Sequence, residues 1–312
     1  MSAVDLSVEF CGLRLKNPVL VASGTFGYGT EYADLVDVSA LGALVTKAVT
    51  LEPRAGNAPP RICETPAGML NAIGLQNPGV EVFLAEKLPR LREFGVPIIV
   101  NVAGREVADY VAVARRLAEA EGVAALELNV SCPNVRAGGM HCGLRPELTA
   151  ELVAAVKQAC PLPLITKLSP NVTDIVEIAR AAVAAGSDAL SLINTLLGLA
   201  IDVERRRPVL ANVTGGLSGP AIRPVAVRMV WEVARAVSVP IIGMGGIMTA
   251  RDALEFLLAG ATAVAIGTAN FVNPDTTAEV VRGLEDYCRR HQVERLADLI
   301  GAALPSLTDT VN

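Results

Sequence analysis

The sequence is poor in histidine, aromatic residues and basic charge, and each shortage disfavours a class of function. The chain has two histidines and six cysteines, and no two cysteines form a Cys-x-x-Cys pair, so we expect no Cys/His zinc site. Aromatic residues make up 4% of the chain, which is low for a platform that stacks single-stranded nucleic acid. The 27 basic residues are outnumbered by 32 acidic ones, which disfavours a polyanion-binding protein.

Membrane and export signals are also missing. The most apolar uncharged stretch, residues 189–201, is shorter than the roughly 20 residues of a membrane-spanning helix. The first ten residues contain Asp5 and Glu9 and no basic residue, unlike a signal peptide. A long chain with few cysteines is typical of a reducing compartment. We therefore expect a cytoplasmic protein that binds neither membrane nor nucleic acid.

What the sequence does contain is a series of short apolar runs rich in Val and Ile. Hydrophobic residues make up 52% of the chain, and the runs do not alternate with polar residues, which is typical of parallel strands buried on both faces. Segments between them carry apolar residues at helical spacing. Strands are expected at 18–23, 43–47, 97–101, 125–129, 163–167, 189–194, 240–243 and 263–267. Helices are expected at 107–121, 146–159, 173–185, 224–237, 249–259 and 277–291.

The alternation of strand and helix predicts an α/β protein with a single (β/α)8 TIM barrel over residues 1–312. A doubly wound open sheet is the alternative, but its Gly-x-Gly-x-x-Gly turn after the first strand is absent. Residues 6–16 are expected to form an N-terminal hairpin around Gly12. Thr173 and Thr249 are expected helix N-caps, and Gly186 a C-cap. The long connections 50–96 and 194–240 are expected to be active-site insertions.

Polar residues gather where the predicted strands end. For one strand, a polar end can simply mark where the chain meets solvent. Six such ends on the same side of a barrel favour a common site, because barrel active sites lie at the carboxyl ends of the strands. The six are Ser23, Lys47, Asn101, Asn129, Lys167 and Asn194.

Two glycine-containing turns follow the last two strands, Gly245-Gly246 and Gly267-Thr268. Either turn alone could reflect a tight bend that needs positive φ. Together, after the strands that bind phosphate in many barrels, they predict a phosphate site. No Gly-x-x-x-x-Gly-Lys-Ser/Thr motif is present, so a phosphorylated cofactor or substrate is favoured over a nucleoside triphosphate.

Cys132 lies just beyond a strand end, in Asn129-Val-Ser-Cys-Pro-Asn134. Its polar surroundings favour a nucleophile or a base, whereas Cys11, Cys63, Cys160 and Cys288 fit the apolar core. Pairing with His141 receives little weight. Residues 64–77 could form a structured surface loop, or Asn71 and Asn77 could hold a planar polar ligand through their amides. Arg54 and Arg61 are interpreted as loop anchors.

These blocks, in this order, resemble the FMN-binding catalytic chains of class 1 dihydroorotate dehydrogenases over nearly the whole length. Matching blocks include residues 22–27, 46–50, 71–79, 129–134, 166–171, 193–195 and 214–220. Residues 69–79 and 194–219 resemble the NAD-linked 1B subclass more than the fumarate-linked 1A subclass. The segment Gly138–Gly143 departs from the subclass pattern, which usually has an aromatic residue there.

The resemblance implies oxidation of (S)-dihydroorotate to orotate in pyrimidine biosynthesis, with Cys132 as the base and FMN as the hydride acceptor. It implies FMN contacts by Ser23, Lys47, Ala48, Asn101, Asn129, Lys167, Ile193, Gly219, Gly245, Gly246, Gly267 and Thr268. It implies substrate contacts by Lys47, Asn71, Ala72, Ile73, Gly74, Leu75, Asn129, Asn194 and Thr195, and no metal.

The resemblance also implies a partner. The sequence lacks a four-cysteine cluster and a nicotinamide-nucleotide motif, so an electron-transfer subunit would carry FAD and a 2Fe–2S cluster. Two catalytic chains would form the homodimer core of a heterotetramer. The alternatives are the fumarate-linked 1A enzyme, another FMN-dependent dihydropyrimidine dehydrogenase, and a non-catalytic phosphate-binding barrel.

Overall fold

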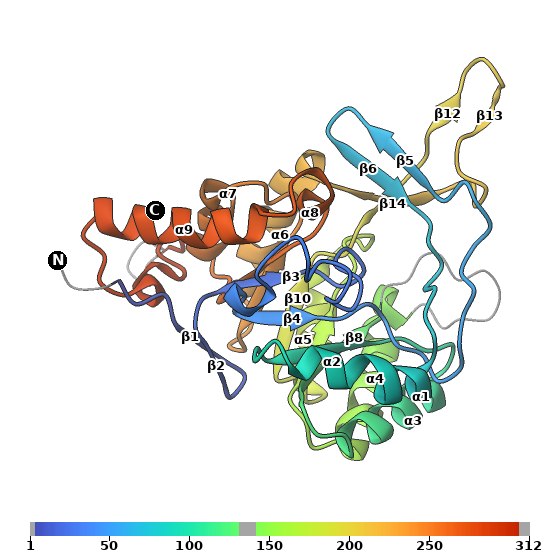
Figure 1. Cartoon of the computed structure of the whole chain (residues 1–312), viewed down its shortest axis with the longest axis horizontal. Helices are drawn as coiled ribbons and strands as arrows, with labels where there is room; N and C mark the ends of the chain where they lie inside the picture. Colours follow the sequence, from blue (N-terminus) through green and yellow to red (C-terminus); the bar gives the residue numbers. More distant parts are fainter. Residues whose placement is uncertain (1–3, 131–141, 306–312) are drawn as a thin grey trace.

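The structure, a computed structural model, describes residues 4–130 and 142–305. Within this part of the chain, the Val- and Ile-rich segments form a closed parallel barrel, as the sequence predicts (Figure 1). The strand order around the barrel is β10-β15-β16-β3-β4-β7-β8-β9. The strands are β3 Val19–Val21, β4 Ala43–Val45, β7 Ile98–Val102, β8 Val123–Asn129, β9 Leu164–Lys167, β10 Ala189–Leu192, β15 Ile241–Met244 and β16 Ala263–Ile266.

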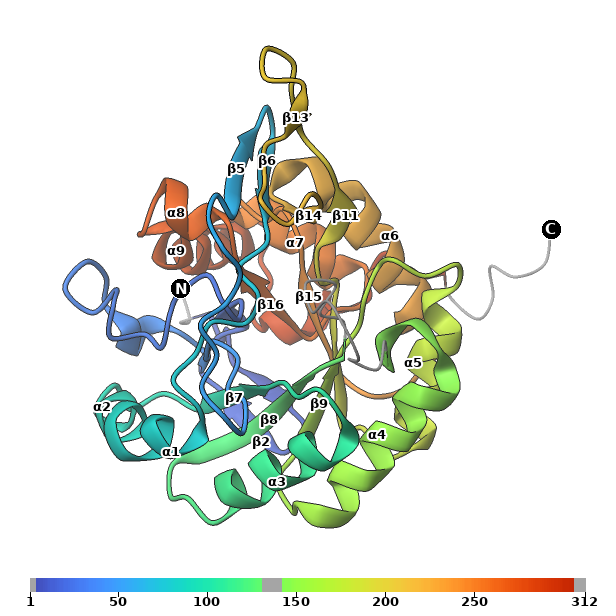
Figure 2. The same ribbon diagram turned by 90° about the vertical axis from the view of Figure 1, so that its right-hand side faces the viewer.

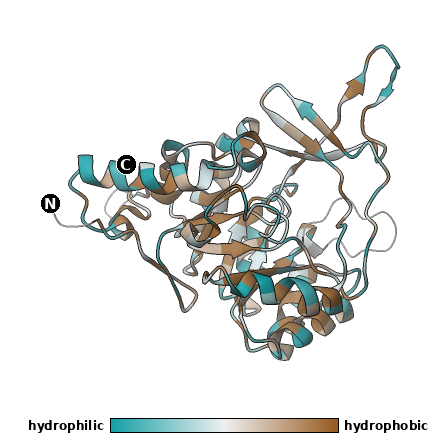
Figure 3. Cartoon of the chain, viewed as in Figure 1, coloured by the Kyte–Doolittle hydropathy of each residue, from teal (hydrophilic) through white to brown (hydrophobic). Residues whose placement is uncertain are grey.

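Helices surround the barrel (Figure 2). They turn their apolar faces toward the strands and their charged faces outward, as the two-toned helices of Figure 3 show. The helices are α1 Val80–Val82, η2 Phe83–Lys87, α2 Leu88–Arg92, α3 Val107–Ala118, α4 Pro146–Ala159, α5 Ile175–Ala184, α6 Arg223–Ala234, α7 Ala250–Leu258, α8 Ala269–Val272 and α9 Thr276–Arg290. Short 3-10 turns are η1 Val38–Ala40, η3 Cys142–Leu144, η4 Pro220–Ile222 and η5 Leu296–Leu299.

Helix ends follow local side-chain chemistry. Thr249 and Asp252 form the capping box that begins α7, and Gly186 follows α5 with a φ of 105°. The predicted N-cap of α5, Thr173, is wrong by one residue. The carboxylate of Asp174 instead accepts a hydrogen bond from the Val176 amide at 2.7 Å, so α5 begins after Asp174.

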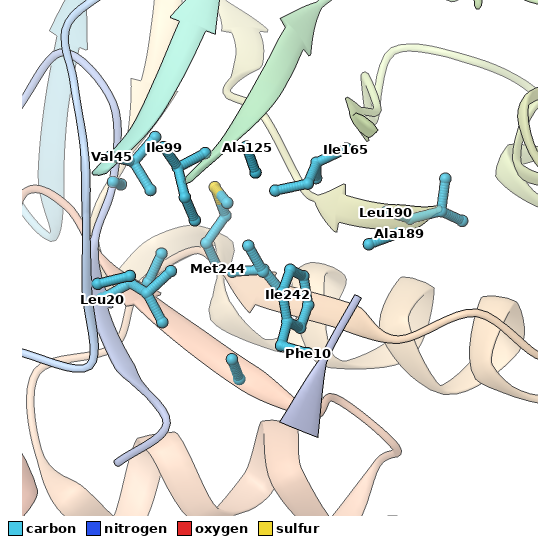
Figure 4. Close-up of a cluster of buried hydrophobic side chains, with 14 of the residues drawn as sticks. Phe10, Leu20, Val45, Ile99, Ala125, Ile165, Ala189, Leu190, Ile242 and Met244 are labelled. Atoms are coloured by element: carbon cyan, nitrogen blue, oxygen red, sulfur yellow. The ribbon is translucent and has the colours of Figure 1, made fainter. Parts of the chain in front are cut away.

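The N-terminal hairpin closes the amino end of the barrel, as predicted. Strands β1 Val8–Phe10 and β2 Leu13–Leu15 pair antiparallel, and Cys11 and Gly12 make the turn with φ of 40° and 83°. Phe10 is fully buried and lies among side chains that line the barrel (Figure 4). Burial of such a side chain contributes roughly 1.5–3 kcal/mol to folding. The amino end of the barrel is therefore closed by packed apolar side chains.

The two long connections meet in one antiparallel sheet at the opposite end of the molecule from the hairpin (Figure 1). Its order is β11-β14-β6-β5, with β5 Ile62–Thr65 and β6 Gly68–Asn71 from the first connection and β11 Leu196–Gly198 and β14 Gly215–Ser218 from the second. A small hairpin, β12 Ile201–Asp202 with β13 Arg207–Pro208, extends beyond it. We call the four-stranded sheet β11-β14-β6-β5 the insertion sheet.

None of the helices in residues 4–130 and 142–305 has the length and apolar character needed to span a membrane.

Candidate functional site

A cavity of about 350 Å³ lies between the carboxyl ends of the barrel strands and the insertion sheet. Barrel strand ends contribute Ser23, Lys47, Asn129, Lys167 and Ile193, and the insertions contribute Met69, Asn71 and Ser218. The structure brings most of the sequence-predicted site residues to this cavity. They are Ser23, Lys47, Ala48, Asn129, Lys167, Ile193, Gly219, Gly245, Gly246, Gly267, Thr268, Asn71, Ile73, Gly74, Leu75, Asn194 and Thr195.

Two predicted residues do not line the cavity. The side chain of Asn101 is fully buried one layer deeper, where its Nδ2 donates to Glu127 Oε1 at 2.6 Å and its Oδ1 has no partner. Ala72 is also fully buried, and its backbone holds the insertion together through Arg61 O and Asn57 Nδ2. The predicted contacts of Asn101 with the flavin and of Ala72 with the substrate stay predictions.

Cys132 and His141 lie outside the described residues. Asn77, which could hold a ligand by its amide, does not line the cavity. Its amide is instead engaged by Thr50, the Leu75 carbonyl and the Gly79 amide, so it fastens the loop.

The two lysines at strand ends have different surroundings. In the described parts of the chain, no carboxylate lies within ion-pair distance of the half-buried Lys47 ammonium. Burial lowers the pKa of Lys47 and nearby Arg61 lowers it further, while the charge of Glu31 acts in the opposite direction. Lys167, in contrast, donates to Ser23 Oγ at 3.1 Å and lies 3.8 Å from Glu127 Oε1. Lys47 is thus a cation available to an anionic ligand.

Amide side chains face the same space. Asn194 Nδ2 lies 3.5 Å from Asn129 Oδ1, and Asn71 Nδ2 lies 3.4 Å from the Gly216 carbonyl, which are long contacts that a ligand could replace. Asn171 was not singled out from the sequence. It positions Thr195 and Leu197 by bonds of 3.0 and 2.8 Å to their backbones.

The glycine turns make a narrow backbone cradle at one side of the cavity. Gly245 and Gly246 have φ of 127° and 78°, a region that favours glycine. A Cβ on Gly246 would lie 2.8 Å from the Gly219 carbonyl oxygen, closer than real side chains approach backbone. Thr268 Oγ1 donates to Ser218 Oγ at 2.7 Å and so joins the second turn to the insertion sheet. Backbone groups can therefore approach a small anionic group here.

Phe271 and Glu127 escaped the sequence analysis, and Arg61 lies at the cavity in addition to being the predicted loop anchor. Arg61 lines the cavity and also anchors a loop, because its Nη2 donates to Gln76 Oε1 at 2.6 Å. Phe271 of α8 lines the cavity with about half of its surface exposed. Glu127, beneath the cavity, is marked in the sequence only as a lone Glu inside an Ala- and Leu-rich strand. Among the described residues, no group of His, Cys, Asp and Glu side chains could hold a metal ion.

Residues 5–288 match the dihydroorotate dehydrogenase family. Three relatives share the name "dihydroorotate dehydrogenase B (NAD(+)), catalytic subunit". The chain is 61% identical over 300 residues to that of Desulforudis audaxviator, covering 96% of this chain and 98% of the relative. It is 57% identical over 302 residues to that of Geotalea daltonii and 58% over 301 residues to that of Alkaliphilus oremlandii, covering 97% and 96% of this chain and 99% of each relative. The chain belongs to the dihydroorotate dehydrogenase family.

Proposed function

We propose that the chain oxidises (S)-dihydroorotate to orotate in pyrimidine biosynthesis and passes the electrons to NAD through a partner subunit. The names of the relatives support this reaction. The observation that carries the proposal is a single cavity that combines the Lys47 ammonium, which has no ion-pair partner among the described residues, with three asparagine amides and a glycine cradle. These features suit a small planar anion on one side and a phosphate-bearing cofactor on the other.

The family implies a flavin, and we propose that it is FMN. The cradle fits a phosphate, since a side chain at Gly246 would fill the space at the Gly219 carbonyl. Gly245, Gly246, Gly267, Thr268 and Gly219 would hold the phosphate. Ser23, Lys47, Ala48, Asn129, Lys167 and Ile193 would surround the ring, with Asn101 beneath them. When bound, the flavin supplies a two-electron acceptor for a hydride.

The substrate would lie with its carboxylate toward Lys47. Its amide-like ring edges both donate and accept hydrogen bonds, as Asn71, Asn129 and Asn194 do. Thr195 and the backbone of Ile73, Gly74 and Leu75 complete the pocket. The insertion sheet above them would exclude water from the reacting carbon atoms.

Cys132 would act as the base. This role is carried by its sequence motif, because the residue lies outside the described part of the chain. The thiolate would take the proton from C5 of dihydroorotate, a hydride would leave C6, and the C5–C6 double bond of orotate would form. Lys47 would hold the carboxylate in place during this step.

The electrons must then leave this chain. We propose that an electron-transfer subunit with FAD and a 2Fe–2S cluster receives them, and that two catalytic chains form the homodimer core of a heterotetramer in the cytoplasm. The chain itself would be one FMN-binding domain over residues 1–312.

Anaerobic titration of the FMN-loaded chain with dihydroorotate tests this function. We expect bleaching of the flavin absorbance by dihydroorotate and none by dihydrouracil, which lacks the carboxylate. Equal bleaching by both compounds would favour a different dihydropyrimidine dehydrogenase. No bleaching by either, with FMN bound, would overturn the proposal, and strong fumarate reduction would indicate the 1A subclass.

A further inference from the structure

A polar layer lies inside the barrel at the floor of the cavity, where Lys167 lines the cavity and the other members lie beneath it. Four successive strands each contribute one side chain to it, namely Asn101 of β7, Glu127 of β8, Lys167 of β9 and Ser191 of β10. Asn101 is in register with Glu127, and Lys167 with Ser191. Bulky branched residues usually fill this part of a barrel, so the presence of polar side chains here requires a physical explanation.

Glu127 contacts each of the other three side chains of this layer. It is fully buried, its Oε1 accepts from Asn101 Nδ2 at 2.6 Å and its Oε2 accepts from Ser191 Oγ at 2.8 Å. The Lys167 ammonium lies 3.8 Å from Oε1, with 6% of the lysine side chain exposed and none of the glutamate. In the described residues, no other ion pair is buried so completely on both sides.

Stability does not account for this pair. Removing two charges from water costs as much as their attraction returns, and apolar replacements of buried ion pairs are often neutral or stabilising. The two residues of the pair also lie at different depths, because Lys167 lines the cavity and Glu127 lies beneath it. Lys47, just beyond β4, has no carboxylate within ion-pair distance among the described residues, and Glu31 acts on it from farther away. The two cations therefore present different net charge to a ligand.

We propose that Glu127 is a positioning residue that acts on the flavin through Lys167 and Asn101. It holds both side chains at the floor of the cavity, and it offsets the charge of Lys167. An uncompensated lysine would stabilise the negative charge of the reduced flavin and raise its reduction potential. Glu127 keeps that potential lower, which favours onward transfer of electrons. This inference rests on the proposed flavin enzyme.

The test is the midpoint potential of bound FMN in Glu127→Gln, which keeps the shape of the side chain and removes its charge. We expect a more positive potential. The protein should favour reduced over oxidised FMN at least about tenfold more strongly than the parent does, which corresponds to about 30 mV for two electrons. Glu127→Asp, which keeps the charge, should remain closer to the parent. An unchanged or more negative potential in Glu127→Gln overturns the proposal.

Asp188→Asn is the matched control. Asp188 pairs with Lys157 at 2.6 Å and accepts from the Leu164 amide, at the opposite end of the barrel. Its loss should lower stability and leave the flavin potential unchanged. An equal shift of potential in this control would mean that general loosening of the barrel, rather than Glu127, sets the potential.

A double variant keeps the proposal testable should Glu127→Gln fail to fold. Lys167→Gln alone should make the potential more negative, and Glu127→Gln with Lys167→Gln should bring it back toward the parent. Identical potentials in these two variants would overturn the role of Glu127. If the parent chain binds FMN but dihydroorotate does not bleach it, the proposed function fails, whereas these potentials still report on Glu127.

Discussion

At the scale of single residues, the two strand-end lysines show how surroundings separate like side chains. Lys167 is held by Ser23 and Glu127, whereas Lys47 lines the cavity with no carboxylate within ion-pair distance among the described residues. We predict that Lys47→Met weakens orotate binding about 10- to 100-fold, because a charge-assisted hydrogen bond contributes about 1.5–3 kcal/mol. Titration of the flavin absorbance with orotate measures this affinity.

Lys16→Met is the control for that variant, since Lys16 is an exposed lysine beside the amino-end hairpin. It should bind orotate as the parent does. The pKa of Lys47 is lowered chiefly by burial, so the parent should lose orotate affinity as pH rises, beginning below the range of an ordinary lysine. This pH dependence should be absent in Lys47→Met. Unchanged affinity in Lys47→Met contradicts a carboxylate role for Lys47.

The proposed base gives a second prediction at this scale. Cys132→Ala should retain FMN and slow flavin reduction by dihydroorotate at least about 100-fold, the lower range of general-base effects. Cys132→Ser should recover part of the rate at high pH, because a hydroxyl is a far weaker acid than a thiol. Stopped-flow absorbance of the flavin follows both rates, and Cys160→Ser, at a buried cysteine outside the cavity, is the control. A parental rate of flavin reduction in Cys132→Ala would contradict the assignment of Cys132 as the base.

Sequence reasoning located most cavity residues because the carboxyl ends of barrel strands meet at one face. It missed Glu127 because that residue lies two positions before Asn129, on the same face of β8 but one layer deeper. It placed Asn101 at the cavity because β7 was expected to end there, whereas the strand continues to Val102. The pattern of polar residues indicates which side chains face the barrel interior. How far each one lies below the cavity depends on the register between strands, which the sequence alone does not give.

At the scale of elements, the glycine turn after β15 can be tested by adding one methyl group. Gly246→Ala would place a Cβ 2.8 Å from the Gly219 carbonyl at a φ of 78°, and we expect it to lower the free energy of unfolding by about 1–3 kcal/mol and to weaken FMN binding. Gly267→Ala is the control, because its Cβ would lie 3.5 Å from Ala22 Cβ, an ordinary contact. Urea unfolding of the FMN-free chains compares them, and equal losses would contradict the cradle geometry.

Elements with local signals were predictable, and elements without them were not. Apolar runs marked every barrel strand, and Gly12 marked the hairpin. The insertion sheet was not anticipated as a sheet, because its central pairing joins Asn71 and Gly216, which are 145 positions apart. No periodicity within either segment indicates such a partner. Only the unusual length of the two connections pointed to a special role.

At the scale of the whole molecule, the barrel and the insertion sheet divide the work of the site. The barrel supplies the lysines and the glycine cradle on rigid strand ends, while the sheet supplies Asn71 and covers the cavity. Neither the described residues nor the sequence motifs supply a counterpart for the later electron transfers. The described residues contain no metal-binding group, and the sequence has no Cys-x-x-Cys pair or Gly-x-Gly-x-x-Gly turn.

We therefore predict that the isolated FMN-loaded chain oxidises dihydroorotate with an artificial dye as acceptor and reduces NAD slowly or not at all. Addition of the electron-transfer subunit should give rapid NAD reduction, because the FAD and iron–sulfur centres that we propose for that subunit would provide the missing route. NADH formation, followed by absorbance with and without that subunit, measures the difference. The dye assay serves as the control, since its rate should not depend on the subunit. Rapid NAD reduction by the isolated chain would show that the acceptor site lies on this chain after all.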